Sequence, residues 1–208
     1  MRDVLIVGAG GLGRELLGWL RDSPDCGTSG EPVGFLDDDP TVAERDLPLP
    51  WRGKIDDFSA DGSTMVVLAL GNSAPRREVG QRLRELGAEF LTFVHPSVIL
   101  GERVAIGEGS VICPRCVLTT DISLGQWCFL NLAVTVGHDV RMGDWVSVSS
   151  QVDLCGGVYV EDGAWMGSGA RVIPSRVIGK DARVGAGSVV IRNVPAGATV
   201  FGNPAKRI

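Results

Sequence analysis

Aliphatic residues recur every six positions through the second half of the chain, from about Val94 to Val194. Counting in sixes from Leu100 to Val190 gives sixteen positions, and each of them is aliphatic or Met. A second, smaller position lies four residues after most of them, as at Cys116. A fixed six-residue period predicts a parallel β-helix of hexapeptides, in which three hexapeptides make one coil and residues about eighteen apart stack.

The first ninety or so residues show apolar runs alternating with helical spacing. Short apolar runs bounded by turn residues predict buried strands, and apolar residues at helical spacing predict helices. We expect strands at 4–7, 33–36, 64–70 and 90–94, helices at 14–21 and 75–87, and a turn region at 51–54. The chain is therefore predicted to have a Rossmann-like α/β half domain at residues 1–93 and an all-β helix of hexapeptide repeats at 94–208, with His95-Pro96 at the boundary.

A glycine-rich turn, Gly8 to Gly13, lies between the first predicted strand and helix and satisfies the spacing GxGxxG. Such a turn lets backbone amides and a helix N-terminus hold phosphate. The second strand ends in three acids, Asp37 to Asp39, where a βαβ unit would present them to a ribose or base. The region is too short for the two halves of a full dinucleotide-binding domain, which favours a nucleotide or nucleotide sugar. NAD binding and a purely structural glycine turn are the alternatives.

Charge and composition narrow the function classes. The net charge of −5 and pI near 5.1, without a Lys/Arg cluster, argue against a nucleic-acid partner. No apolar run approaches the ~18 residues that span a bilayer, so no membrane partner is expected. The chain starts directly with a strand pattern, and its five cysteines are an odd number, so we expect no signal peptide, reduced thiols and a cytoplasmic location.

Cys113 and Cys116 have the CxxC spacing of redox and metal motifs. Both fall inside the hexapeptide repeat, where Cys116 takes the small inward position. No second CxxC and no nearby His completes a metal site, and no helix N-terminus is expected there to activate a thiolate. We therefore interpret both residues as packing and expect no metal.

The two histidines of the chain differ in their surroundings. His95 precedes Pro96 at the domain boundary and is interpreted as structural. His138 follows Gly137 at a predicted corner of the β-helix, and Asp139 follows it directly. An imidazole titrates near neutrality and suits a general base, and a neighbouring carboxylate can orient the ring and favour its protonated form. Without a Ser-His-Asp or Cys-His arrangement, direct attack assisted by this one base is the simplest mechanism.

Motifs over essentially the whole chain resemble one family. They are Gly8-Ala9-Gly10-Gly11, Phe35-Leu36-Asp37-Asp38, Gly71-Asn72 with Arg76, His95-Pro96-Ser97, Asn131, Val136-Gly137-His138-Asp139, the uninterrupted hexapeptides and Gly202-Asn203-Pro204-Ala205-Lys206. Together they are similar to the left-handed β-helix acyltransferases, and among these to the sugar acetyltransferases of the sialic acid O-acetyltransferase and UDP-4-amino-sugar (bacillosamine-pathway) N-acetyltransferase type. The left-handed coil comes from this resemblance, since ordinary crossovers are right-handed.

The resemblance implies an acetyl-CoA-dependent homotrimer with active sites between neighbouring β-helices and a role in polysaccharide biosynthesis. It assigns the base to His138 and its acidic neighbour to Asp139. The implied acetyl-CoA contacts are Ser147, Gly156, Ser168 and Ala186. The implied nucleotide-sugar contacts are Gly10, Gly11, Leu12, Asp37, Asp38, Asn72 and Arg76.

Two departures from the family pattern bear on the acceptor. Many members carry His at the position of Leu12, and some carry His at the position of Ser147. The expected function is acetyl transfer to the amino group of a nucleotide-linked amino sugar. The alternatives are O-acetylation of a sugar of the sialic acid type and a scaffold that binds a nucleotide sugar without catalysis. A carbonic-anhydrase-like metalloenzyme would need three His ligands, more than the two in the chain.

Overall fold

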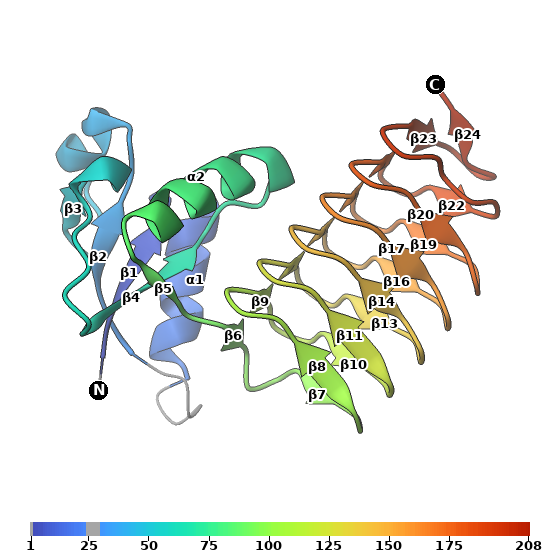
Figure 1. The fold of residues 1–208 in the computed structure, drawn as a ribbon, viewed down its shortest axis with the longest axis horizontal. Coiled ribbons are helices and arrows are strands. Elements are labelled where there is room, and N and C mark those ends of the chain that lie inside the picture. Colours follow the sequence, from blue (N-terminus) through green and yellow to red (C-terminus); the bar gives the residue numbers. More distant parts are fainter. Residues whose placement is uncertain (1, 24–29) are drawn as a thin grey trace. The chain divides into compact units, whose positions relative to one another are not determined.

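The computed structural model describes residues 2–23 and 30–208 of the chain (Figure 1). The chain divides into two compact units, Met1–Phe93 and Val94–Ile208. The first is an α/β unit and the second is a parallel β-helix.

The first unit is built on a five-stranded sheet in the order β3-β2-β1-β4-β5, and every neighbouring pair is parallel. Its elements are β1 (Asp3–Val7), α1 (Gly11–Arg21), β2 (Glu31–Leu36), η1 (Pro40–Glu44), β3 (Trp51–Gly53), η2 (Ile55–Asp57), β4 (Thr64–Leu68), α2 (Ser73–Glu85) and β5 (Glu89–Phe90). The strand order reverses direction at β1, which is where open α/β sheets bind ligands. The Rossmann-like fold class predicted for this part of the chain is confirmed.

Close packing of α1 on β1 explains one glycine of the turn. A Cβ on Gly13 would collide with the carbonyl oxygen of Gly8, so only glycine lets the helix approach the strand this closely. The helix buries Leu16, Leu17 and Leu20 on its inner side. The glycine turn therefore has a packing role whatever else it binds.

Two expectations for this unit were wrong in detail. Trp51–Gly53, expected as a turn, is strand β3, which pairs with β2 at the sheet edge. Three residues are too few to show the alternation by which strands are recognised in a sequence. The single strand expected at 90–94 is two strands, β5 and β6 (Phe93–Val94), and β6 pairs with a strand of the β-helix.

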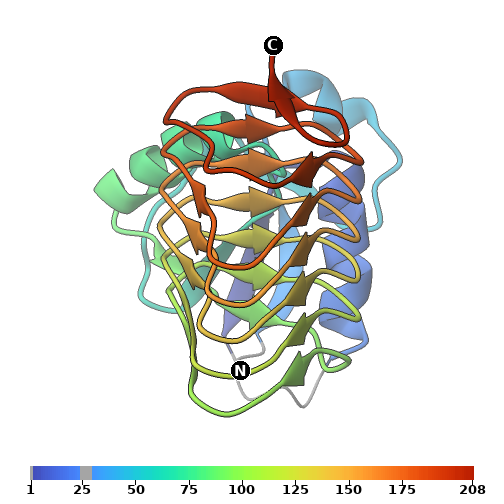
Figure 2. The ribbon, with the colours of Figure 1, turned by 90° about the vertical axis from the view of Figure 1, so that its right-hand side faces the viewer.

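The second unit is a left-handed parallel β-helix with three sheets, and its coils stack along one axis (Figure 2). The first sheet contains β7 (Ile99–Leu100), β10 (Val117–Leu118), β13 (Thr135–Val136), β16 (Asp153–Leu154), β19 (Arg171–Val172) and β22 (Val189–Val190). The second contains β8 (Val104–Ile106), β11 (Ile122–Leu124), β14 (Arg141–Met142), β17 (Tyr159–Val160) and β20 (Val177–Ile178). The third contains β6, β9 (Val111–Ile112), β12 (Phe129–Leu130), β15 (Ser147–Val148), β18 (Trp165–Met166), β21 (Arg183–Val184), β23 (Thr199–Phe201) and β24 (Lys206–Arg207).

The eighteen-residue stacking predicted from the repeat is confirmed. Val117 pairs with Thr135, and Leu118 pairs with Val136, each eighteen residues on. Fourteen of the sixteen ladder positions, from Ile112 to Val190, are buried in one continuous core. Leu100 is 46% exposed because it lies in the first coil, where no coil precedes it. Among the described residues, no helix is long and apolar enough to cross a membrane.

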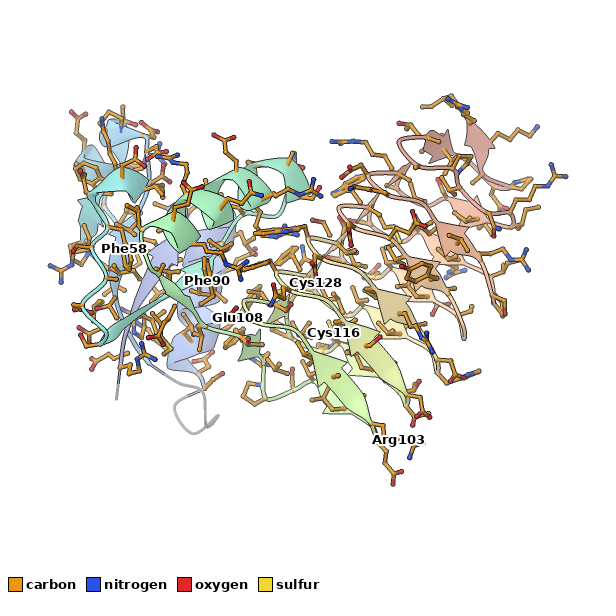
Figure 3. The ribbon with its side chains drawn as sticks, viewed as in Figure 1. Phe58, Phe90, Arg103, Glu108, Cys116 and Cys128 are labelled. Atoms are coloured by element: carbon orange, nitrogen blue, oxygen red, sulfur yellow. The ribbon has the colours of Figure 1, made fainter. Side chains whose placement is uncertain are left out.

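The cysteines of the CxxC pair are packing residues. Cys113 and Cys116 are both fully buried, and the Cys116 thiol donates to the carbonyl of Asn131 at 3.0 Å. Burial raises the pKa of Cys116 to about 11, so the thiolate needed for redox or metal chemistry is disfavoured. Figure 3 marks Cys116 and Cys128, which both occupy small inward positions of the ladder.

The ladder makes a prediction about stability. Leu130→Ala removes a fully buried side chain from the middle of the core and should lower the free energy of unfolding by about 2–5 kcal/mol. Urea denaturation followed by circular dichroism measures this loss. Lys180→Ala, at an exposed corner, is the control and should change the value by less than about 0.5 kcal/mol. Equal effects of the two substitutions would contradict the inward ladder.

Candidate active site

His138 and Asp139 form a side-chain pair at a corner of the β-helix. The Nδ1 atom of His138 lies 2.7 Å from Oδ2 of Asp139. Both side chains are open to solvent, with exposed fractions of 68% and 66%. When Nδ1 carries the hydrogen and donates it to the carboxylate, Nε2 is left as a lone-pair acceptor. The pair thus presents an oriented base at the surface.

Asp139 lies at a sharp turn of the backbone that recurs at this corner. Asp139 has a φ of 60°, in the left-handed region. Asp and Asn enter this region more readily than most residues, because their short polar side chains bond locally. Arg103 and Asp121 occupy the same corner in the two preceding coils, with φ of 54° and 56°. The sharp turn is therefore common to successive coils. What distinguishes the coil of His138 is the pair of side chains that it carries there, His138 and Asp139.

Arg103 and Asp121 form an ion pair in those preceding coils. The Nη2 atom of Arg103 donates to Oδ2 of Asp121 at 2.7 Å, and this guanidinium holds the pKa of Asp121 below its ordinary value. Arg103 extends outward from the corner (Figure 3). Asp139, one coil further on, bonds to the imidazole of His138 instead.

A pocket of about 440 Å³ lies beside this pair. It is lined by Asp139, Arg141, Gly157, Val158 and Tyr159. Arg141 and Tyr159 are paired residues of β14 and β17, and both are exposed. Sequence reasoning missed them, although the eighteen-residue spacing was a signal that could have found them.

The residues expected to contact acetyl-CoA lie at three places in the coil. Gly156 is eighteen residues after His138 and stacks on it. Ser168 and Ala186 are exposed and occupy a different corner of two successive coils. Ser147 is 1% exposed and lies in β15. Within one chain, only Gly156 is brought next to the His138–Asp139 pair.

A second pocket, of about 110 Å³, lies at the carboxyl ends of β1, β2 and β4 in the first unit. Its lining residues are Val7, Gly8, Leu36, Asp37, Asp38, Ile55, Leu70 and Val79. This is the edge of the sheet where the strand order reverses, the usual ligand site of open α/β sheets. Of the residues expected to contact a nucleotide sugar, Asp37 and Asp38 line it.

Both carboxylates already have partners inside the unit. Asp37 accepts from the backbone N–H of Ala9 at 2.8 Å and from that of Asp39 at 3.0 Å. Asp38 accepts from the N–H of Ile55 at 2.9 Å and from Arg82 at 2.7 Å. The first contact ties the second strand to the glycine turn, so the acids shape the pocket as well as line it.

Arg82 is a functional candidate that sequence reasoning missed. Its guanidinium bridges Asp38 and Asp56, each at 2.7 Å. Burial acts to raise the pKa of Asp38, but the hydrogen bond from Arg82, together with the Ile55 amide, leaves that pKa below its ordinary value. The pairing joins residues forty-four apart, which no local pattern reveals.

The remaining expected contacts lie at the two helix starts. Gly10 is the N-cap of α1, with Gly11 and Leu12 following it, and Asn72 is the N-cap of α2. Arg76 is only 2% exposed and donates to the carbonyl of Leu70 at 2.7 Å. Arg76 therefore holds the backbone of Leu70, which lines the pocket. Its direct contact with a substrate stays a prediction.

Within residues 2–23 and 30–208, no group of three or more His, Cys, Asp or Glu side chains is placed to hold a metal ion. His95 bonds to Ser97 at 2.8 Å in the turn that leads into the β-helix.

The chain is similar to known acetyltransferases over its full length. Residues 3–83 match the family model described as the PglD N-terminal domain. The chain is 31% identical to GDP-perosamine N-acetyltransferase of Escherichia coli O157:H7, over 98% of this chain and 95% of that protein. Its structure matches that of PerB from Caulobacter crescentus in complex with CoA and GDP-perosamine, with a TM-score of 0.89, 30% identity, and coverage of 99% of this chain and 97% of that one.

A third match is the acetyltransferase domain of PglB from Neisseria gonorrhoeae in complex with acetyl coenzyme A, with a TM-score of 0.87, 29% identity, and coverage of 100% and 99% of the two chains. The fold and these matches define a hexapeptide-repeat acyltransferase. More narrowly, the chain belongs to the hexapeptide-repeat sugar N-acetyltransferase family. The family expected from the sequence motifs is confirmed.

The Arg82 bridge predicts a change in one carboxyl titration. Arg82→Met removes the guanidinium but leaves the burial of Asp38, so the pKa of Asp38 should rise from its lowered value. Titration of the side-chain carboxyl carbon by NMR measures this directly. Asp39, whose pKa is lowered by Thr41, is the internal control and should not move. An unchanged pKa of Asp38 would mean that Arg82 does not hold it.

Proposed function

We propose that this protein transfers the acetyl group of acetyl-CoA to the amino group of a nucleotide-linked amino sugar. The observation that carries the proposal is the exposed His138–Asp139 pair, joined at 2.7 Å, in a chain similar along its length to a GDP-perosamine N-acetyltransferase. A base at the surface suits a reaction between two substrates that both arrive from solution.

The pocket of the first unit is the proposed nucleotide site. It lies at the carboxyl edge of a parallel sheet, next to the N-terminus of α1, where backbone N–H groups favour phosphate. Asp37 and Asp38 would accept hydrogen bonds from a ribose or base, with Gly10, Gly11 and Leu12 on the phosphate side. Asn72 and Arg76 would complete the site through the loop that ends at α2.

Acetyl-CoA is proposed to bind between two β-helices of a homotrimer. The proposed contacts fall on two corners of the coil, Gly156 beside His138 at one and Ser168 with Ala186 at another. Both corners are convex. A single extended ligand therefore contacts both most simply when the two corners belong to neighbouring chains. Ser147, on a flat face between corners, is the remaining proposed contact.

The proposed chemistry needs one base. Nε2 of His138 takes a proton from the acceptor amine as its nitrogen attacks the thioester carbonyl. A new C–N bond forms, and the tetrahedral oxyanion is held by a backbone N–H, which we assign to a glycine-rich coil of the adjacent subunit. The C–S bond then breaks, and the protonated imidazole passes its proton to the departing thiolate. Asp139 keeps the ring in the required tautomer through Nδ1.

Two other activities fit parts of this arrangement. O-acetylation of a sugar would use the same base on a hydroxyl, but the similarity to GDP-perosamine N-acetyltransferase and to PerB favours an amine acceptor. A scaffold that binds a nucleotide sugar without catalysis would use the first unit alone. A cytoplasmic location is part of the proposal, because five cysteines, an odd number, favour reduced thiols.

The role of His138 is tested by its removal. His138→Ala should lower kcat for acetyl transfer by at least about 10²–10⁴-fold, because general-base catalysis is lost. Acetyl-CoA affinity and oligomer size should stay as in the parent protein. CoA release measured with a thiol reagent gives the rate, and calorimetry gives the affinity.

Glu102→Ala is the matched control for His138→Ala, since Glu102 occupies the same corner two coils earlier. It should leave the rate within about twofold, as expected for an exposed side chain away from the pair. A His138→Ala protein that keeps most of its rate would overturn the assignment.

The acceptor is tested with a panel of UDP-, dTDP- and GDP-linked 4-amino sugars and sialic acid. A bound substrate raises the thermal midpoint by an amount that depends on its concentration and Kd. One nucleotide amino sugar should both raise the midpoint and release CoA in the presence of the enzyme. Stabilisation without any CoA release or acetyl-CoA binding would favour the scaffold.

A further inference from the structure

Gly156 lies directly over the imidazole of His138. A Cβ built on Gly156 would collide with Nε2 of His138, and would lie 2.5 Å from Cε1 and 3.0 Å from Cδ2 of the same ring. Real Cβ contacts are essentially never shorter than 3.0 Å. The edge of the ring that carries the proton-accepting nitrogen therefore rests against a residue without a side chain.

The backbone does not require glycine at this position. Gly156 lies outside the left-handed region of φ, whereas Gly157, the next residue, has a φ of 68°. Any L-residue could adopt the conformation of Gly156. The reason for glycine must therefore lie in the space around it.

Equivalent residues in the other coils carry side chains. One backbone hydrogen bond recurs at this corner, from the residue after each corner position to the carbonyl one coil earlier: Asp121 to Glu102, Asp139 to Thr120, Gly157 to His138 and Ser175 to Gly156. The equivalent positions are thus Glu102, Thr120, His138, Gly156 and Pro174. Of these five positions, only the one that stacks on His138 is glycine. The imidazole therefore explains why residue 156 has no side chain.

We infer that Gly156 is a positioning residue for the base: by leaving its Cβ space empty, it lets the imidazole lie against the coil while Nδ1 bonds to Asp139. A side chain at 156 would push the Nε2 edge away, and rotation of the ring would break the 2.7 Å contact with Asp139. A displacement of about 1 Å at a reacting atom can cost on the order of 100-fold in rate. The inference rests on the proposed function of His138.

This role is additional to the acetyl-CoA contact proposed for Gly156. An effect on that contact would change affinity whether or not the imidazole is present. A positioning role acts on kcat, and it disappears once the ring is removed. The two can be separated by combining substitutions at 156 and 138.

The test is a double-mutant cycle of Gly156→Ala, His138→Ala and the double variant in the full-length protein. Gly156→Ala should lower kcat for acetyl transfer by about 100-fold. It should leave the Kd of acetyl-CoA within about twofold, because the contact proposed for residue 156 is made by its backbone. It should also lower the thermal midpoint by about 4 °C in the parent protein but not in the His138→Ala background, because the methyl group then fills the space of the ring.

Two results would overturn the inference. An equal rise in the Kd of acetyl-CoA in both backgrounds would leave Gly156 with the cofactor contact as its only role. An equal loss of thermal midpoint in both backgrounds would mean that residue 156 is crowded by atoms other than the imidazole. If Gly156→Ala does not fold, the inference requires the double variant to fold, and failure of both contradicts it.

The outcome is distinguishable from failure of the proposed function. If His138→Ala keeps its rate, His138 is not the base, while the coupling of thermal midpoints between 138 and 156 still stands. If His138→Ala is inactive but the two positions are not coupled, only the role of Gly156 fails.

Discussion

The stacking of eighteen-residue coils is the constraint on which the rest of the β-helix depends. Parallel backbone pairing fixes which residue lies over which, as in the pairing of Leu118 with Val136. The aliphatic ladder buries one continuous core, so a coil can shift only by a whole repeat. At the His138 corner the side chains of His138 and Asp139 lie outside this core, and the fixed stacking gives each of them a defined neighbour in the next coil. In this way Gly156, which has no side chain, lies against the imidazole of His138.

The period of the β-helix could be predicted from the sequence because every coil repeats the same inward positions. The ladder from Ile112 to Val190 and the packing role of Cys113 and Cys116 followed from it. Contacts that depend on side-chain direction could not be predicted. Spacing put Asp139 beside His138 but left open where its carboxylate points, and only the structure shows its 2.7 Å contact with Nδ1 of His138. Strand β3, at Trp51, was too short to show a period.

The first unit shows a different limit of prediction from the sequence. Its glycine turn and terminal acids indicated a phosphate and ribose site, and the pocket does lie at that edge of the sheet. However, Asp37 and Asp38 also serve the fold, since they accept from Ala9, Ile55 and Arg82. A motif reports which groups are available near a site, while their existing partners determine what they can still bind. The long-range partner Arg82 is visible only in the structure.

A crystal structure of the protein with CoA and a nucleotide amino sugar tests whether acetyl transfer occurs at the His138 corner, between neighbouring chains. We expect the CoA sulfur and the acceptor amine within hydrogen-bond reach of Nε2 of His138, with Ser168 and Ala186 of an adjacent chain along the cofactor. CoA bound away from His138, or held entirely by one chain, would contradict it.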